Sequence, residues 1–301
     1  MRYKKSVIAV FILPAVLFFC LIFLYPIIRT GVMSFYDVEN LTSGISEWLF
    51  SGFDNYKKLG NTSLFRISMW NLFRIWAVGG IVVMLLALLF AVILNNDIKG
   101  KKFFRAVIYM PNIISAVALA TMWLQYVYNP RFGLLTTFFN DLGLTAIAKT
   151  QWTAPNNKFW AMLFAYCFGM VGYHMLIFSS GIEKIPSELY EAASIDGASI
   201  PAQFKNITLP LLKGVVKTNL TMWSITSVSF FTWSQLFSSV LSDVDTISPV
   251  VYLYNQVFSG GNVVTERNAG IGAAVGILMG LCVVLVFLII NVLIRDDDFE
   301  F

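Results

Sequence analysis

Histidine is the side chain best suited to moving protons near neutral pH, and this chain contains one, His174. It lies in the uncharged run Phe159–Ile182, and neither this run nor five other long uncharged runs contains an acidic residue. Ion-driven carriers commonly place charged groups inside their membrane spans. Acid–base and metal chemistry need a second convergent group. The sequence therefore disfavours an ion-coupled carrier and an enzyme, predicts no catalytic residue and no metal site, and favours a packing role for His174.

Binding of nucleotide phosphates is the second chemistry to consider. The chain has no Gly-x-x-x-x-Gly-Lys-Ser/Thr loop, whose backbone amides would cradle phosphate groups. If ATP drives the process in which this chain takes part, ATP and its Mg²⁺ must bind to another chain. No cofactor is predicted on this one.

One polar segment has the pattern of a small helical unit. Pro186 suits the start of a helix and Glu188 falls in its first turn, where a negative charge is favourable. Gly197 suits the left-handed conformation that ends a helix, and Pro201 turns the chain into a second helical stretch. The sequence predicts a helix-turn-helix within residues 182–212, compact enough to be gripped by a partner protein.

The composition says what surrounds this unit. Of the 301 residues, 57% are hydrophobic and 13% are charged, about half the charged share of a soluble domain. Runs of about 20 apolar residues cross a bilayer as helices, because unpaired backbone groups are too costly in lipid. An all-α polytopic membrane protein with six transmembrane helices is predicted. The six runs are Val7–Ile28, Ile75–Leu94, Ala106–Pro130, Phe159–Ile182, Thr218–Ser242 and Asn268–Ile294.

Basic residues predict the sidedness, since Lys and Arg gather in cytoplasmic loops. Twelve lie in one set of connections, which includes both termini and the 182–212 segment, and eight lie in the opposite set. Both termini are therefore predicted to be cytoplasmic, and the first run is read as a retained span. The first set is Arg2, Lys4, Lys5, Lys99, Lys101, Lys102, Arg105, Lys184, Lys205, Lys213, Lys217 and Arg295. The second set is Arg29, Lys57, Lys58, Arg66, Arg131, Lys149, Lys158 and Arg267.

The 182–212 segment also carries a family signature. Glu191-Ala192-Ala193, Gly197 and the stretch 207–210 have the spacing of the EAA motif. The chain thus resembles permease subunits of bacterial binding-protein-dependent ABC importers. The resemblance implies that this loop docks into a cleft of an ATP-binding subunit and transmits its closure. It assigns that contact to Glu188, Glu191, Ala192, Ala193, Asp196, Gly197, Ile207, Leu209 and Pro210.

Further patterns are similar to carbohydrate permeases of the maltose and glycerol-phosphate type, among them Tyr25-Pro26 and Gly52-Phe53-Asp54-Asn55-Tyr56. The segment 241–246 before Pro249 departs from that pattern, since the glycine-rich stretch usual there is missing. The resemblance implies one transmembrane domain over residues 1–301 in the bacterial inner membrane. It also implies a heterodimer with a second homologous permease, two ATP-binding subunits and an extracytoplasmic solute-binding protein, with no nucleic acid. A peptide, polyamine or phosphate importer and, remotely, a polytopic membrane enzyme remain alternatives.

Two stripes at helical spacing are candidates for the solute pathway, because sugars need both hydroxyl partners and flat aromatic faces. They lie in the fourth and fifth runs, where their distance from the EAA motif resembles a substrate-lining region of maltose-type permeases. Ordinary helix packing is the alternative. Gly272, Gly276 and Gly280 in the sixth run form one small-residue face, which is read as a packing surface. The pathway candidates are Tyr166, Met170, Tyr173, Trp223, Ser227 and Phe230.

Overall fold

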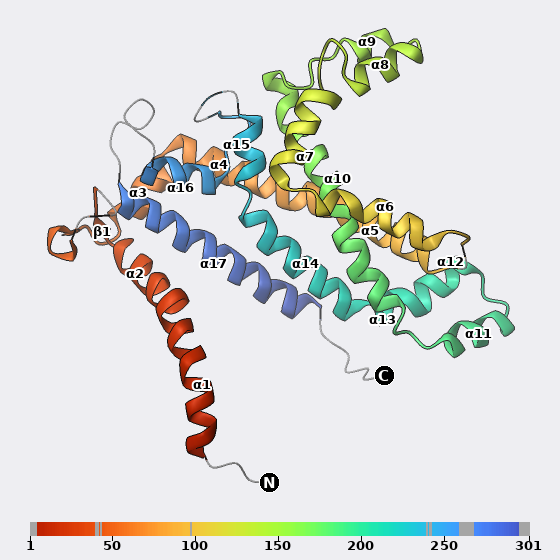
Figure 1. The fold of residues 1–301 in the computed structure, drawn as a ribbon, viewed down its shortest axis with the longest axis horizontal. Helices are drawn as coiled ribbons and strands as arrows, with labels where there is room; N and C mark the ends of the chain where they lie inside the picture. Colours follow the sequence, from red (N-terminus) through yellow and green to blue (C-terminus); the bar gives the residue numbers. More distant parts are fainter. Residues whose placement is uncertain are drawn as a thin grey trace. The chain divides into compact units, whose positions relative to one another are not determined.

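The computed structural model describes residues 5–39, 42, 44–96, 98–238, 240, 243–258 and 268–294. Helices dominate these residues (Figure 1), beside one antiparallel pair of two-residue strands, β1 (Tyr36–Asp37) and β2 (Leu49–Phe50). The chain forms two compact units, residues 1–66 with 249–281 and residues 67–248 with 282–301. The fold is that of an all-α membrane protein.

Four helices of the described chain are long and apolar enough to cross a membrane, and one bent pair of helices would make a fifth. The predicted first, second, fourth and sixth runs are thereby confirmed as helical. The four helices are Val10–Met33, Ser63–Asn95, Pro155–Ile182 and Ala269–Leu293.

The third predicted run, Ala106–Pro130, is not one helix. Its first part belongs to α6 (Lys101–Ile113), and its second part is Ala116–Val127, which is bent away by 99°. Pro111 lies inside α6 and lacks the amide hydrogen that would bond the preceding turn. Ser115 then caps the next helix by accepting a hydrogen bond from the Ala118 amide at 3.3 Å.

The fifth predicted run, Thr218–Ser242, is also broken, so six continuous spans are not found among the described residues. Helix α14 (Lys213–Val228) ends at Val228, and α15 (Thr232–Phe237) begins four residues later. Hydroxyl side chains in α14 donate to the carbonyl four residues before them, which bends helices. These donors are Thr218, Thr221, Ser224, Thr226 and Ser227.

In the first unit, the backbone that follows α2 is held by hydrogen bonds from two other parts of the chain. The amide nitrogen of Asn55 donates to the carbonyls of Ser34 (3.0 Å) and Tyr36 (2.8 Å), and the Ala269 amide donates to the Val38 carbonyl (2.6 Å). A single buried polar side chain thus fixes the end of the first span. The unit contains α1 (Lys5–Phe19), the π-helical turn Cys20–Leu24, α2 (Tyr25–Met33), α3 (Asp54–Asn61), α16 (Pro249–Phe258) and the start of α17 (Ala269–Leu293).

The face of Gly272, Gly276 and Gly280 in the last span packs closely against a neighbouring helix at one end only. A Cβ at Gly272 would clash with Val257 of α16, and one at Gly276 would lie 3.7 Å from Leu253. A Cβ at Gly280 would meet nothing within 4 Å. The packing role predicted for this face therefore applies to Gly272 and Gly276.

The second unit is built around α10 (Pro155–Ile182), which packs along α5 (Gly80–Asn95), α6 and α14. Its fully buried side chains include Ile75, Met162, Met175 and Trp223. The other elements are most of α4 (Ser63–Arg74), the π-helical turn Ile75–Gly79, α7 (Ala116–Met122), the π-helical turn Trp123–Val127, α8 (Leu134–Asp141), α9 (Thr145–Ala148), α11 (Ser187–Ile195), α12 (Ile200–Gln203), the π-helical turn Phe204–Thr208, α13 (Leu209–Leu211), α15 and the end of α17.

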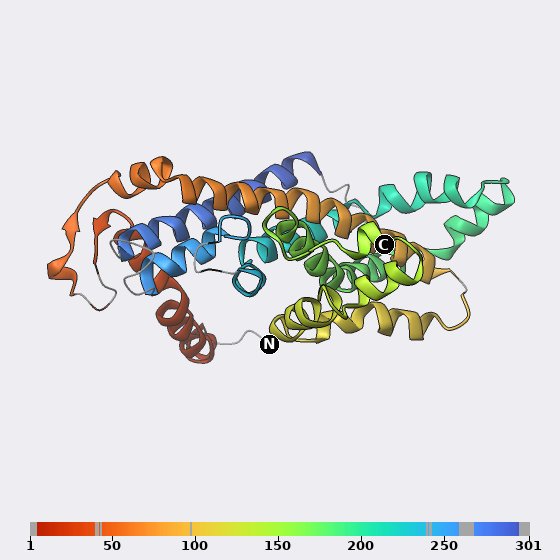
Figure 2. The same ribbon diagram turned by 90° about the horizontal axis from the view of Figure 1, so that it is seen from above.

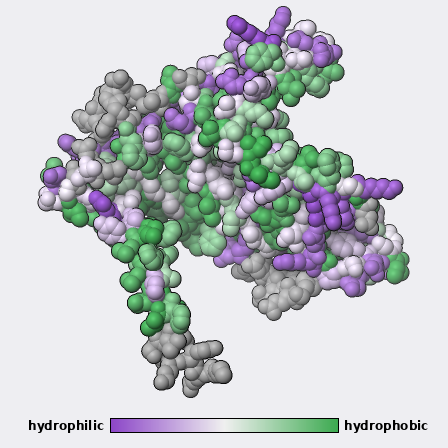
Figure 3. Space-filling model, viewed as in Figure 1, coloured by the Kyte–Doolittle hydropathy of each residue, from purple (hydrophilic) through white to green (hydrophobic). Residues whose placement is uncertain are grey.

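Polar surface lies at the two ends of this second unit. Figure 3 shows hydrophilic side chains gathered over α8 and α9 at one end and around α11–α13 at the other, with a largely apolar surface between them. Figures 1 and 2 show that α11 projects beyond the end of α5. Exposed apolar side chains such as Leu85 (64%) and Phe164 (61%) lie in the intervening region, as expected where lipid is the solvent.

Candidate functional site

The predicted helix-turn-helix is present. Helix α11 follows Pro186 and has Glu188 in its first turn. Gly197 has φ +78°, and the Ala198 amide donates to the Ala193 carbonyl at 2.8 Å. This is the left-handed cap predicted from the glycine, and it satisfies a carbonyl of the last turn. The second arm runs from α12 through a π-helical turn to α13.

Side chains hold the two arms together. The Tyr190 and Thr208 hydroxyls lie 2.9 Å apart, and the Gln203 amide nitrogen donates to the Ser194 hydroxyl (3.0 Å) and to the Ala198 carbonyl (3.1 Å). Residues 187–211 therefore form a cross-linked helical hairpin, called the 187–211 hairpin below. A hairpin with its own internal bonds can transmit a push as one piece.

The hairpin presents most of its motif residues outward. Among the predicted contact residues, Ala193 and Ile207 are half-buried, and the others are exposed. Sequence reasoning missed two further side chains, Ile195 (87% exposed) and Ile200 (69% exposed), which flank Gly197. Two apolar residues beside the turn of a polar loop are the signal that could have identified them. Exposed apolar groups outside the membrane are typical of docking surfaces.

The stem of the hairpin is fastened to two other helices. Arg105 of α6 forms an ion pair with Glu183 just after α10 (2.7 Å) and donates to Asn95 at the end of α5 (2.9 Å). A cavity of about 220 Å³ lies between the hairpin and the end of α5, and polar residues such as Asn95, Tyr190 and Thr208 form part of its lining. Movement of the hairpin must therefore act on α5, α6 and α10.

The structure brings together the two stripes predicted for the solute pathway. The Tyr166 ring of α10 lies 5.6 Å from Trp223 and 4.8 Å from Phe230. The Trp223 indole donates to the Trp76 carbonyl (2.8 Å), and the Ser227 hydroxyl donates to the Trp223 carbonyl (2.7 Å). Four of the six predicted pathway side chains, Tyr166, Trp223, Ser227 and Phe230, are thus buried together in this conformation. Ordinary packing between two helices would give the same geometry.

Glycine makes room for the Trp223 indole. A Cβ at Gly80 would lie 2.7 Å from the Trp223 indole nitrogen, and one at Gly79 would lie 2.9 Å from its ring carbon. These two glycines at the start of α5 therefore determine how deeply the indole enters the seam. Sequence analysis did not single them out.

The remaining pathway candidates are less buried. Met170 and Tyr173 are partly exposed, and the Tyr173 ring lies edge-on to His174 at 5.1 Å. His174 is fully buried, its Nδ1 lies 2.7 Å from the Asn219 side-chain oxygen, and its ring packs against Trp223 at 5.8 Å. The histidine thus packs in the same seam, as predicted.

Comparison with known proteins decides the family. Residues 83–296 match the family described as "Binding-protein-dependent transport system inner membrane component", and this match spans well over half of the chain. The chain belongs to this family. It is therefore a permease, an integral membrane subunit for transport rather than an enzyme.

Proteins with similar sequences match the permease over nearly its whole length. It is 30% identical to the arabinooligosaccharides transport system permease protein AraP of Bacillus subtilis, over 95% of this chain and 88% of that protein. It is 29% identical to the trehalose/maltose transport system permease protein MalF of Thermococcus litoralis, over 92% and 90%. A crystal structure of a bacterial alginate ABC transporter, in complex with an alginate pentasaccharide-bound periplasmic protein, has the same fold. Its TM-score is 0.79 at 20% identity, covering 97% of this chain and 94% of that one.

Proposed function

We propose that this permease forms half of the membrane pathway of an ATP-driven importer for a carbohydrate. The observation that carries the proposal is the seam of Tyr166, Trp223, Ser227 and Phe230 in the second unit, where three aromatic rings lie together and the Ser227 hydroxyl is buried on the same helix as Trp223. Aromatic faces bind the apolar side of a sugar ring, and hydroxyls bind its edge. The carbohydrates named for AraP and MalF support the same solute class.

Uptake by the reconstituted complex tests the solute class. Labelled di- and oligosaccharides should be taken up in an ATP-dependent manner, whereas labelled peptides, polyamines and phosphate should not. Uptake of an amino compound or of phosphate in place of every sugar tested would contradict the proposal.

The proposal includes the partners. A second homologous permease supplies the other half of the pathway, two ATP-binding subunits dock on the 187–211 hairpins, and a solute-binding protein delivers the sugar outside the cell. The exposed Ile195 and Ile200 support docking at the hairpin. Helix Val10–Met33 supports a permease pair, because its apolar segment has 0% burial within the chain. The chain would lie in a bacterial inner membrane with both termini in the cytoplasm.

Cysteine labelling tests the topology. Ser187→Cys and Lys101→Cys, each in a background without Cys20, Cys167 and Cys282, should react with a membrane-impermeant thiol reagent only after the cells are opened. Lys57→Cys should react in intact spheroplasts, because the basic-residue distribution predicts that this residue lies outside. All three positions are exposed or half-buried, so accessibility should report sidedness. Labelling of position 187 from outside would invert the topology.

Two single-atom deletions test the pathway. Ser227→Ala and Tyr173→Phe each remove one hydroxyl, and a lost hydrogen bond of about 1 kcal/mol should lower uptake roughly fivefold at limiting sugar. Assembly and basal ATP hydrolysis should stay normal, because the ring of Tyr173 and the shape of the seam are kept. Parent-like uptake across sugar concentrations, or a defect confined to assembly, would assign these residues to packing instead.

A further inference from the structure

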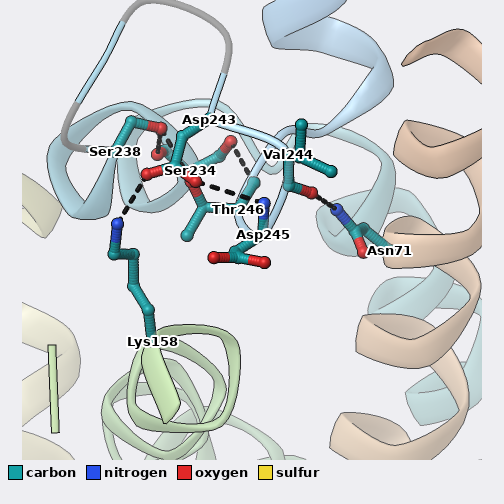
Figure 4. Close-up of polar contacts among 8 residues, drawn as sticks. All are labelled: Asn71, Lys158, Ser234, Ser238, Asp243, Val244, Asp245 and Thr246. Carbon is teal, nitrogen blue, oxygen red and sulfur yellow. Dashed lines mark hydrogen bonds and ion pairs between the residues drawn. The ribbon is translucent and has the colours of Figure 1, made fainter. Parts of the chain in front are cut away.

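A buried ion pair lies at the end of α10 opposite the hairpin. Lys158 in the first turn of α10 contacts Asp243 at 2.6 Å, and their side chains are only 5% and 8% exposed (Figure 4). Lys158 lies 24 residues before Ile182, roughly 36 Å along the helix. The pair is thus separated from the 187–211 hairpin by about the thickness of a membrane.

This pair is an expensive way to hold two elements together. Removing two charges from water costs more than their attraction commonly returns, and apolar residues of similar volume often pack as well or better. A lysine in the first turn also meets the positive end of the helix dipole. An ion pair is better suited to a contact that must break during function. Water that enters between Lys158 and Asp243 hydrates both charges and so stabilises the separated state.

Asp243 begins a segment, residues 243–248, that is bonded to two further helices. The Asn71 amide nitrogen of α4 donates to the carbonyls of Val244 (3.1 Å) and Ile247 (2.9 Å). The Ser234 hydroxyl of α15 donates to the Thr246 carbonyl (2.6 Å), and the hydroxyl of Ser238, the residue after α15, lies 2.7 Å from the Thr246 hydroxyl. Figure 4 shows Asn71, Ser234 and Ser238 around Asp243, Val244 and Thr246 of residues 243–248, which we call the 243–248 segment.

The far end of the segment reaches the candidate pathway. The Ser248 hydroxyl donates to the Phe230 carbonyl at 2.7 Å. Phe230 lies in the break between α14 and α15, and its ring contacts Tyr166. The broken end of the fifth run is therefore connected through Ser248 and the 243–248 segment to Lys158.

We infer that Lys158 and Asp243 are positioning residues for transport. Their ion pair seats the 243–248 segment at the outer end of the candidate pathway and so holds Phe230 against Tyr166. Outward opening separates the two charges, water replaces the contact, and the segment moves with the broken end of the fifth run. This role rests on the proposed function, because it assigns the outer end of that same pathway.

Variants of the full assembled complex test the inference. Lys158→Met removes the ion pair with Asp243 in the closed state, so the open state should gain population. Basal ATP hydrolysis without the solute-binding protein should then rise about tenfold. The reason is that the ATP-binding subunits close when the permease is in its open state, and this state is now populated more often. Lys158→Arg keeps the charge and should behave like the parent. Lys57→Met is the matched control, because it removes an exposed ion pair with Asp54 (3.1 Å), and it should change nothing.

A second measurement needs neither ATP hydrolysis nor a solute, so its result does not depend on the proposed function. Ser227→Cys, in a background without the native cysteines, should react slowly from outside because Ser227 is fully buried. Adding Lys158→Met should speed that reaction about tenfold. An assembled Lys158→Met complex with parent rates of both basal hydrolysis and labelling would overturn the inference.

The double variant Lys158→Met/Asp243→Leu decides the case if Lys158→Met does not assemble. Two apolar side chains restore the packing but resist exposure to water. The inference expects normal assembly, low basal hydrolysis and impaired uptake from this variant. Parent-like uptake would show that the pair only holds the structure together, and would overturn the positioning role.

Discussion

Replacing Gly197 with valine is expected to abolish solute-stimulated ATP hydrolysis by the assembled complex while the permease remains inserted in the membrane. Gly197 has φ +78°, a conformation that a β-branched residue adopts only with strain. A Cβ there meets nothing within 4 Å, so the effect would come from the backbone of the hairpin turn and not from a clash. Glu191→Lys should have the same result, because it reverses an exposed charge of the motif. Stimulated hydrolysis by the reconstituted complex is the measurement.

Gly143 offers a matched control for the strain itself. It has φ +74°, it also has nothing within 4 Å of a built Cβ, and it lies in the connection between α8 and α9. Gly143→Val should therefore introduce similar local strain and leave stimulated hydrolysis intact. Normal solute-stimulated ATP hydrolysis by both Gly197→Val and Glu191→Lys would show that the 187–211 hairpin does not couple ATP hydrolysis to transport.

Gly172→Ala is expected to lower the stability of the permease strongly. Helix α6 crosses α10 so closely that a Cβ at Gly172 would lie 2.6 Å from the Tyr109 Cα and closer still to the Ile108 carbonyl oxygen. These are backbone atoms, so only a shift of α6 could relieve the clash. Overpacking of this kind costs about 3 kcal/mol or more. The thermal melting temperature of the purified permease in detergent should fall clearly.

Gly280→Ala is the control for Gly172→Ala, since its Cβ would occupy open space within a span. Its effect on the free energy of unfolding should stay within about 0.5 kcal/mol. If the two variants melted alike, the close crossing of α6 and α10 would be wrong.

Local signals determined what the sequence could predict. The 187–211 hairpin follows from Pro186, Glu188 and Gly197, because helix starts and left-handed caps depend on residues within a few positions of each other. The breaks in the third and fifth runs were missed, because hydropathy counts apolar residues and does not register a proline or a series of hydroxyl bonds.

Distant pairs could not be predicted in this way. Lys158 and Asp243 are 85 positions apart, and sequence analysis counted Lys158 only as one basic residue of an outer loop. His174 and Asn219 are 45 positions apart, so the lone histidine could not be matched with its partner. The aromatic seam was found because helical spacing on two spans is a local pattern, although only the structure shows that the two stripes meet.

Helix α10 gives the permease a mechanical property. It runs unbroken for 28 residues, roughly 42 Å, with Lys158 in its first turn, and the hairpin begins five positions after its last residue, Ile182. Because α10 packs along α5 and α6, we expect it to tilt as one body, so that a movement at the hairpin end is transmitted to the Lys158 end in the same event. Under the proposals above, closure of the ATP-binding subunits and release of the 243–248 segment are therefore coupled, because both follow from the same movement of α10. On those proposals, opening of both ends at once would require α10 to break, so its unbroken backbone hydrogen bonds would oppose a leak.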